Sequence, residues 1–126
     1  MAIAHFSASF ITAGRSPVAA AAYRHRTEMT DRTIAETWSF ARETDLVHAE
    51  ISVPPDSPEW VKEIVSGDRV AQSSERLWNE VAAQEKRRNG QQAREFVIAL
   101  PQELTRHQNI ALVRDFIDAE FAAKGM

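Results

Sequence analysis

A tyrosine and two arginines on one short stretch are the residues best suited to chemistry. Tyr23 is the only tyrosine among 126 residues, and Arg24, His25 and Arg26 follow it directly. A phenol oxygen can act as a nucleophile, while neighbouring guanidiniums hold an anionic phosphodiester and lower the cost of forming a phenolate. The pattern therefore indicates phosphate chemistry. Without the rest of the sequence, the pattern fits better a tyrosine whose ring packs against the protein and whose hydroxyl group contacts water.

A helix must carry this tyrosine, and its start is visible in the sequence. Ser16 can accept hydrogen bonds from the free amides of a first turn, and Pro17 fits the first helical position because it has no amide to lose. The alanines that follow propagate a helix at no side-chain entropy cost. We expect this helix to fade near residues 29–31 and to present Tyr23 at the end of a smooth alanine face.

Alternating apolar and polar residues predict the strands around that helix. Residues 2–12, 46–53 and 93–100 each follow the two-residue period of a half-buried strand. Prolines follow the second and third of these segments and cannot donate to a strand ladder, so they should end the strands. Residues 30–45 are mixed and polar, which predicts a loop or a short irregular strand.

Further helix-start signals occupy the rest of the chain. A serine–proline pair stands at 57–58, and Asp68 can cap a next helix that ends in Glu85 and the basic run 86–88. Thr105 with Gln108 three residues later is a capping-box signature for the last helix. The order strand, helix, strand, helices, strand, helix predicts an α+β fold, an antiparallel sheet with helices packed mainly on one face.

Composition limits the function classes. The chain has 15 Lys and Arg against 18 Asp and Glu, a net charge of -3, so nucleic acid would be contacted by local basic patches rather than by bulk charge. The absence of cysteine excludes disulfides, a zinc knuckle and a thiol nucleophile, and fits a cytoplasmic protein. No apolar run reaches the length of a membrane span. The length fits a single domain over residues 1–126.

Basic and histidine residues offer weaker signals. The run 86–88 together with Arg94 could track a DNA backbone, although a solvated helix end fits the run as well. His5 and His48 fall on polar strand faces and are more typical of hydrogen-bonded surface residues than of ligands. No two of the four histidines lie two or four residues apart, so none matches a metal motif; they are His5, His25, His48 and His107.

Several separated segments together resemble the N-terminal part of plasmid mobilisation relaxases of the MobA/TraA (MobQ, HUH-type) family, also called MobA/MobL. The similarity is greatest to the conjugative-transfer TraA relaxases of rhizobial plasmids. It extends over nearly the whole chain, with the motifs in the family's order, and implies a partial HUH relaxase fold. The similar segments are Ser16 to Arg26, Leu46 to Pro54, Leu77 to Asn79, Ala93 to Pro101, Asn109 to Phe116 and Lys124 to Met126.

The resemblance implies nicking and religation of single-stranded DNA at a plasmid origin of transfer. Tyr23 would be the nucleophile and stay linked to the DNA 5′ end, while Mg²⁺ or Mn²⁺ polarises the scissile phosphate. Arg24, Arg26 and Arg94 would contact DNA phosphates. Glu95 would orient a metal ligand or help to take the phenol proton, although a solvated or arginine-paired carboxylate fits the pattern equally well. The implied partners are transfer-origin DNA and relaxosome proteins.

The family's metal motif, a His-hydrophobe-His strand, would lie after Gly125 and Met126. We therefore expect this chain to lack a metal centre of its own, to be incomplete at its C-terminus and not to be competent alone. It would also lack two family strands, which leaves a sheet edge that invites self-association. The alternatives are a non-catalytic module that binds DNA or relaxosome proteins, and the remnant of a decayed gene.

Overall fold

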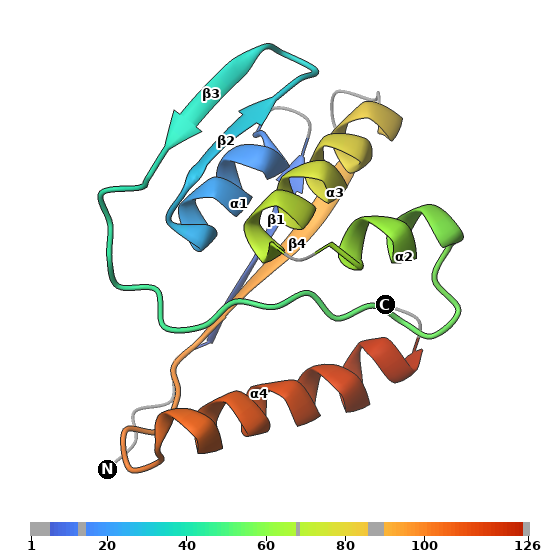
Figure 1. Cartoon of the computed structure of the whole chain (residues 1–126). Coiled ribbons are helices and arrows are strands. Elements are labelled where there is room, and N and C mark those ends of the chain that lie inside the picture. The colour runs from blue at the N-terminus through green and yellow to red at the C-terminus, as the bar shows by residue number, and fades with distance from the viewer. Residues whose placement is uncertain (1–5, 13–14, 68, 86–89, 125–126) are drawn as a thin grey trace.

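The computed structural model of the protein describes residues 6–12, 15–67, 69–85 and 90–124. Two separate antiparallel ribbons and four α-helices make up this part of the chain, which is therefore an α+β fold (Figure 1). In order, the elements are β1 (Phe6–Thr12), α1 (Pro17–His25), β2 (Glu28–Asp31), β3 (Glu36–Ser39), α2 (Glu59–Val65), α3 (Val70–Gln84), β4 (Gln91–Ile98), α4 (Arg106–Glu120) and the short 3₁₀ helix η1 (Ala122–Lys124).

β1 and β4 pair as an antiparallel ribbon, which places the first strand of the chain beside a strand from its C-terminal half. Ser9 lies opposite Glu95 and Ala8 lies opposite Phe96. Because successive residues of a strand point to opposite faces, Glu95 and Phe96 face different sides of the ribbon. Glu95 faces α1, where it binds Arg24. The ring of Phe96 lies 5.6 Å from that of Phe121, which follows α4.

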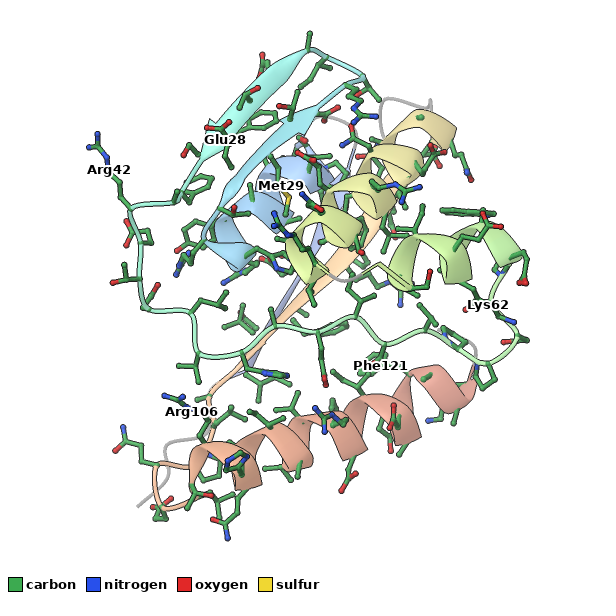
Figure 2. The ribbon with its side chains drawn as sticks, viewed as in Figure 1. Glu28, Met29, Arg42, Lys62, Arg106 and Phe121 are labelled. Atoms are coloured by element: carbon green, nitrogen blue, oxygen red, sulfur yellow. The ribbon has the colours of Figure 1, made fainter. Side chains whose placement is uncertain are left out.

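The hydrophobic core lies between α1, the hairpin of β2 and β3, and α3 (Figures 1 and 2). Small side chains on α1 let the hairpin and α3 approach closely, and Met29 of β2 fills the space between them with 1% of its surface exposed. The buried members of this core are Val18, Ala21, Ala22 and Met29, and Trp38, Phe40, Ala71 and Trp78 pack against them.

Buried hydrogen bonds fix the start of α1 against the hairpin. Ser16 accepts from the Ala19 amide at 3.2 Å, as predicted for a helix cap, and its hydroxyl donates to Asp31 at 2.6 Å. Asp31 is 2% exposed and also accepts from the amide and hydroxyl of Thr33. Burial alone would raise the pKa of Asp31, but these bonds outweigh it and lower the pKa. The network fixes the register of the helix that carries Tyr23.

Asn79 fastens the same hairpin to α3. Its side chain accepts from the Arg32 amide at 2.8 Å and donates to the Thr30 carbonyl at 2.9 Å. Glu75, one turn earlier, accepts from the Thr30 amide at 2.8 Å. These two side chains of α3 thus satisfy backbone groups on the edge of β2 that faces away from β3, where no strand pairs with it in the described residues.

Two sequence-based predictions about strands are wrong. Residues 46–53 lie in an irregular connector, residues 40–58, and do not form a strand, because alternation makes a strand only where a partner edge is available, and no described strand pairs with this segment. Residues 30–45, expected to be a loop or a short irregular strand, contain most of a regular two-stranded hairpin, β2 with β3. The single sheet expected from three strands is therefore two ribbons. The boundaries also differ, since β4 covers residues 91–98 and not 93–100.

The first helix ends earlier than its sequence suggests. α1 stops at His25 instead of fading near residues 29–31, because Arg26 adopts a left-handed conformation with φ 52°. Pro58, without a side-chain cap, precedes α2, and Ser57 instead donates to the Pro54 carbonyl.

The last helix begins as predicted, with both bonds of the Thr105–Gln108 capping box formed. Asp68, the basic run 86–88, His5 and Gly125 lie outside the described residues. In the described part of the chain, no helix has the length and apolar character needed to cross a membrane.

Candidate active site

Tyr23 lies near the end of α1, with its ring packed against Phe40 and partly open to solvent. The ring packs edge-on against Phe40 at 5.3 Å between centroids, with 88° between the planes. With 42% of its surface exposed, the side chain can be reached from solvent. A core tyrosine would be enclosed, so this placement keeps the ring fixed and leaves it accessible to a ligand.

Two arginines contact the tyrosine ring. The Arg26 guanidinium carbon lies 4.2 Å from the ring centroid and that of Arg24 lies 5.2 Å away. The left-handed turn at Arg26 folds its side chain back over the ring, and its NH1 donates to the Tyr23 carbonyl at 2.6 Å. Positive charge is therefore held next to the phenol by the way that the helix ends.

Each of these arginines is held by a carboxylate from another part of the chain. Arg24 forms a two-pronged pair with Glu95 of β4, at 3.0 Å and 2.9 Å. Arg26 pairs in the same way with Asp45 of the connector, at 2.7 Å and 3.2 Å. Such forked pairs fix the plane as well as the position of a guanidinium.

The carboxylates remain charged because of these bonds. The hydrogen bond from Arg24 lowers the pKa of Glu95, and the hydrogen bond from Arg26 lowers the pKa of Asp45. In return, Glu95 raises the pKa of Arg24. Around Tyr23 the protein therefore presents two fixed, permanently charged guanidiniums.

The structure brings together four of the five predicted site residues. Tyr23, Arg24, Arg26 and Glu95 form one cluster. Arg94 is elsewhere: it lies opposite Phe10 in the β1–β4 register, and its guanidinium is 5.5 Å from the Phe10 ring, on the other face from Glu95. Its contact with phosphate stays a prediction.

Sequence reasoning missed Asp45. It lies in a connector with no recurring pattern, and nothing in its neighbours indicates a partner 19 residues earlier. His5, one of the two histidines on polar strand faces, lies outside the described residues. The other, His48, approaches Glu50 at 3.4 Å, and Glu50 is bound by Arg114 of α4 at 2.8 Å and 3.0 Å.

The described residues do not fit a metal site. They contain no group of three or more His, Asp or Glu side chains arranged to hold a metal ion. Glu95, the carboxylate of the cluster, is already bound by Arg24.

Comparison with known proteins gives a consistent result. The MobA/MobL family model matches residues 15–126. The conjugal transfer protein TraA of Agrobacterium fabrum is 49% identical over 128 residues, covering 100% of this chain and 12% of that protein. The mobilization protein MobL of Acidithiobacillus ferridurans is 38% identical over 114 residues, covering 89% of this chain and 27% of that protein.

A solved structure shares the fold. It is described as the molecular basis of vancomycin resistance transfer in Staphylococcus aureus, and it superposes with a TM-score of 0.76 at 28% identity. The match covers 94% of this chain and 56% of that one. Like the TraA relative, this neighbour is longer than the present chain.

Proposed function

The chain belongs to the MobA/MobL family, and from this premise we propose that it is the tyrosine-bearing part of a conjugative relaxase. Such an enzyme nicks and rejoins single-stranded DNA at a plasmid origin of transfer. The proposal depends on one observation, the two carboxylate-fixed guanidiniums that contact the ring of Tyr23. The chain spans 12% of its TraA relative, so the activity of the whole protein belongs to this proposal.

In the proposed reaction, the phenol oxygen of Tyr23 bonds to phosphorus as the bond from phosphorus to the 3′ oxygen breaks. The phenol proton passes to a base and the 3′ oxygen gains a proton, so a 3′ hydroxyl leaves and the 5′ phosphate stays on the tyrosine. The reverse step reseals the strand. Negative charge builds up on the phosphoryl oxygens during transfer, and guanidiniums fixed beforehand stabilise that charge without reorganising.

Arg24 and Arg26 can contact a phosphate while they keep their carboxylates. A guanidinium has five N–H donors, and a forked pair uses only some of them. Because the pKa of Glu95 is lowered by Arg24, this carboxylate is a poor proton acceptor. We therefore assign Glu95 to holding Arg24 in place, which favours the arginine-paired alternative over a role as general base.

The remaining parts of the proposal follow from the family resemblance. Transfer-origin DNA and relaxosome proteins are the proposed partners, and Mg²⁺ or Mn²⁺ the proposed cofactor, in the cytoplasm. Because the described residues contain no metal-ligand cluster, we propose that other polypeptide supplies the ligands and that this chain alone does not nick DNA. The sheet edges of β1 and β4, each with one paired neighbour in the described residues, are the proposed route of self-association.

A chimera tests the function. The region of Agrobacterium fabrum TraA that matches this chain is replaced by residues 1–126, and the product is incubated with Mn²⁺ and a labelled strand from that plasmid's origin. We expect a covalent protein–DNA adduct on a denaturing gel, absent in Tyr23→Phe and retained in Arg42→Ala, whose exposed side chain points away from the protein (Figure 2). Unmodified TraA is the positive control. An active TraA beside an inactive chimera, or an adduct in Tyr23→Phe, would contradict the proposal.

A non-catalytic DNA-binding module is the second candidate. The lack of a metal-ligand cluster in the described residues favours it, since such a module needs only the arginines. The two candidates differ in the chimera: a module would bind the strand with wild-type affinity and form no adduct. Adduct formation by the isolated chain would contradict both this candidate and the proposed incompetence of the chain alone.

A further inference from the structure

Phe40, the first residue of the connector, contacts the ring of Tyr23 with a defined geometry. The two ring centroids lie 5.3 Å apart and the ring planes stand at 88° to one another, which is an edge-to-face pair. Aromatic rings favour this arrangement because the positive edge of one ring meets the negative face of the other. The contact therefore favours one orientation of the Tyr23 ring and does more than cover it.

The helix itself gives the Tyr23 ring little support. A helical side chain leans over the turn before it, toward the residues three and four positions earlier. At Tyr23 these residues are Ala20 and Ala19, whose methyl groups are too short to hold an aromatic ring. The tyrosine is also 42% exposed, so much of its remaining surface faces solvent. Support for the ring must therefore come from another segment of the chain.

Phe40 is itself fixed in place, so it can supply that support. Its side chain packs against the hydrophobic core between α1, the hairpin and α3. Its backbone amide donates to the Thr27 carbonyl at 3.1 Å, and its carbonyl accepts from the Glu43 amide at 3.1 Å. The Thr27 amide in turn donates to the carbonyl of Ala22, the residue before Tyr23, at 3.1 Å. Two successive backbone hydrogen bonds thus connect Phe40 to the helix turn that carries the tyrosine.

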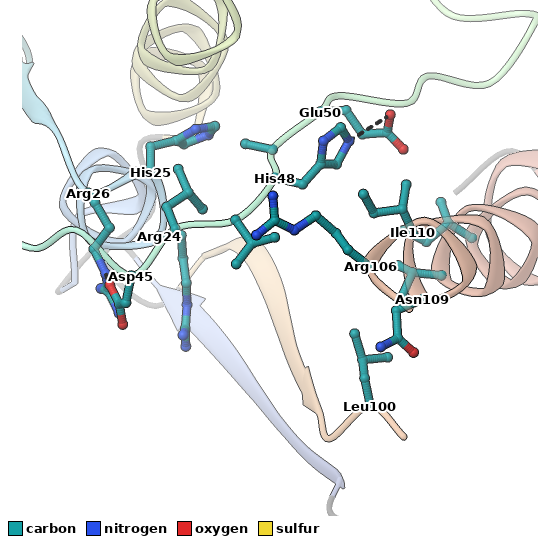
Figure 3. Close-up of a pocket in the computed structure, with 15 residues that line it drawn as sticks. Arg24, His25, Arg26, Asp45, His48, Glu50, Leu100, Arg106, Asn109 and Ile110 are labelled. Carbon is teal, nitrogen blue, oxygen red and sulfur yellow. Dashed lines mark hydrogen bonds and ion pairs between the residues drawn. The ribbon is translucent and has the colours of Figure 1, made fainter. Parts of the chain in front are cut away.

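The same segment reaches the surroundings of Tyr23 a second time, at Asp45. Asp45 binds Arg26, whose guanidinium carbon lies 4.2 Å from the centre of the tyrosine ring. Figure 3 shows Asp45 beside Arg26 at the end of α1, where both residues line a cavity of about 770 Å³. The ring is thus contacted by Phe40 and by Arg26, and both contacts depend on residues 40–45.

We propose that Phe40 is a positioning residue for the cleavage step and acts through Tyr23. In phosphoryl transfer the attacking oxygen lies roughly in line with the bond that breaks. Because Phe40 limits the orientations of the Tyr23 ring, it also limits the directions from which the phenol oxygen can approach phosphorus. The inference rests on the proposed function for the reaction. It adds to the site a residue that carries no charge and donates no side-chain hydrogen bond.

The sequence provides a selective probe for this contact. Tyr23 is the only tyrosine of the chain, so isotopically labelled tyrosine gives NMR signals from this residue alone. The ring of Phe40 shifts these signals as long as it stays edge-to-face with Tyr23. In Phe40→Leu we expect the Tyr23 ring signals to move toward those of tyrosine in a short unstructured peptide.

Trp38→Leu is the matched control. Trp38 lies on β3 of the same hairpin, packs against the same core and makes no ring contact with Tyr23 in the described residues. Each variant therefore removes one aromatic ring from this core, and thermal unfolding measures how far each lowers the stability. The Tyr23 signals should stay near their wild-type positions in Trp38→Leu.

Kinetics of the TraA chimera test the positioning role. Covalent adduct formation is followed in a single turnover with Mn²⁺ over a range of DNA concentrations. In Phe40→Leu we expect the rate constant at saturating DNA to fall at least about tenfold, because small displacements of a reacting group have effects of that size or more. The half-saturating DNA concentration should stay at its wild-type value, and Trp38→Leu should keep most of the rate.

A conservative variant separates positioning from packing. Phe40→Tyr keeps the aromatic ring, so it should recover most of the rate that Phe40→Leu loses. The double variant Tyr23→Phe with Phe40→Tyr should form no adduct, which shows that the added phenol is not the nucleophile.

Three results would overturn the proposal. The first is a Phe40→Leu chimera with the wild-type rate constant. The second is an equal loss of rate in Phe40→Leu and Trp38→Leu, which would make Phe40 a core residue only. The third is a higher half-saturating DNA concentration with an unchanged rate constant, which would assign Phe40 to DNA binding.

The two proposals can fail separately. If the wild-type chimera forms its adduct and Phe40→Leu forms it equally fast, the positioning role is wrong and the proposed function stands. If the chimera is inactive while the Tyr23 signals of the isolated chain move in Phe40→Leu alone, the proposed function is wrong. The role of Phe40 in cleavage then falls with it, and the ring contact remains as the orientation of a tyrosine with another role.

Discussion

The guanidinium of Arg26 lies 4.2 Å from the centre of the Tyr23 ring, and Asp45 holds it there from a different part of the chain. Residues three apart on a continuous helix are neighbours on its surface, but Arg26 lies just past the end of α1. The left-handed backbone at Arg26, with φ 52°, turns the side chain back over the ring. Arginine orientation at this site therefore depends on both a helix end and a connector residue.

Asp45→Ala should impair nicking more than it impairs folding. Without the carboxylate, the Arg26 guanidinium loses its fixed plane, so we expect a lower rate constant for adduct formation in the chimera with DNA affinity nearly unchanged. Asp45→Glu, which can rebuild the forked pair, should recover part of the rate. A rate equal to wild type in Asp45→Ala would show that Arg26 needs no such support.

Arg24→Ala and Arg94→Ala should differ, although they remove the same charge. Arg24 contacts the tyrosine ring, whereas Arg94 lies over Phe10 on the other face of β4. We expect Arg24→Ala to slow adduct formation in the chimera by at least about tenfold, the scale of one lost charge-assisted contact in the transition state. Arg94→Ala should stay near the wild-type rate. Equal losses of rate would indicate that Arg94 also acts in the cleavage step and not only in DNA contact.

Asp31→Asn should destabilise the fold. Asp31 is 2% exposed and accepts bonds from Ser16 and Thr33, and an amide cannot accept at both of its ends. We expect a loss of about 2 kcal/mol in the free energy of unfolding, typical of a buried hydrogen bond to a charged group, measured by urea titration. Glu36→Gln, on the exposed strand of the same hairpin, is the control and should change little.

Acid should weaken the link between α4 and the connector. Hydrogen bonds from Arg114, and secondarily from His48, lower the pKa of Glu50 from 4.5 to about 2. Because the folded pKa lies below the unfolded one, the pair stabilises the fold above pH 4.5 and this contribution is lost as the pH falls toward 2. In Glu50→Gln, the free energy of unfolding should therefore vary less over this range than in wild type. Parallel pH profiles of the two proteins would contradict the assignment.

DNA affinity of the isolated chain should depend on salt only moderately. The net charge is -3, and binding would use a few local arginines. For single strands, the slope of log affinity against log salt is about -0.7 for each phosphate contacted, so Arg24 and Arg26 together give a slope of about -1.4. Anisotropy titrations with a labelled oligonucleotide measure this slope. Each arginine-to-alanine change should make it shallower.

Much of the candidate site was predictable because its members are neighbours in sequence. Ser16, Pro17 and the alanines determine where the helix starts, and the capping box at Thr105 likewise begins α4 as predicted. The resemblance to the N-terminal part of plasmid mobilisation relaxases, TraA in particular, is confirmed by the family match and the relatives. The helix starts depend on residues that are close together in the chain, and the family resemblance is a sum of matches over its whole length.

The rest depended on contacts between distant segments. Residues 46–53 alternate like a strand, but only a partner edge turns alternation into a ladder, and the described fold pairs none with it. Residues 28–39 form a hairpin because Glu75 and Asn79 of α3 satisfy its edge. Asp45 gains its role from the backbone turn at Arg26, which no residue preference indicates.

The connector is clamped at two points, by Arg26 of α1 at Asp45 and by Arg114 of α4 at Glu50. In the described residues, these exposed ion pairs join the connector to α1 and α4, whereas the core around Met29 is held by apolar contacts. Counter-ions weaken the first kind of attachment and leave the second intact. The distance between α1 and α4 should therefore increase in concentrated electrolyte while the protein stays folded. Salt concentration would then control how easily a ligand reaches the phenol of Tyr23.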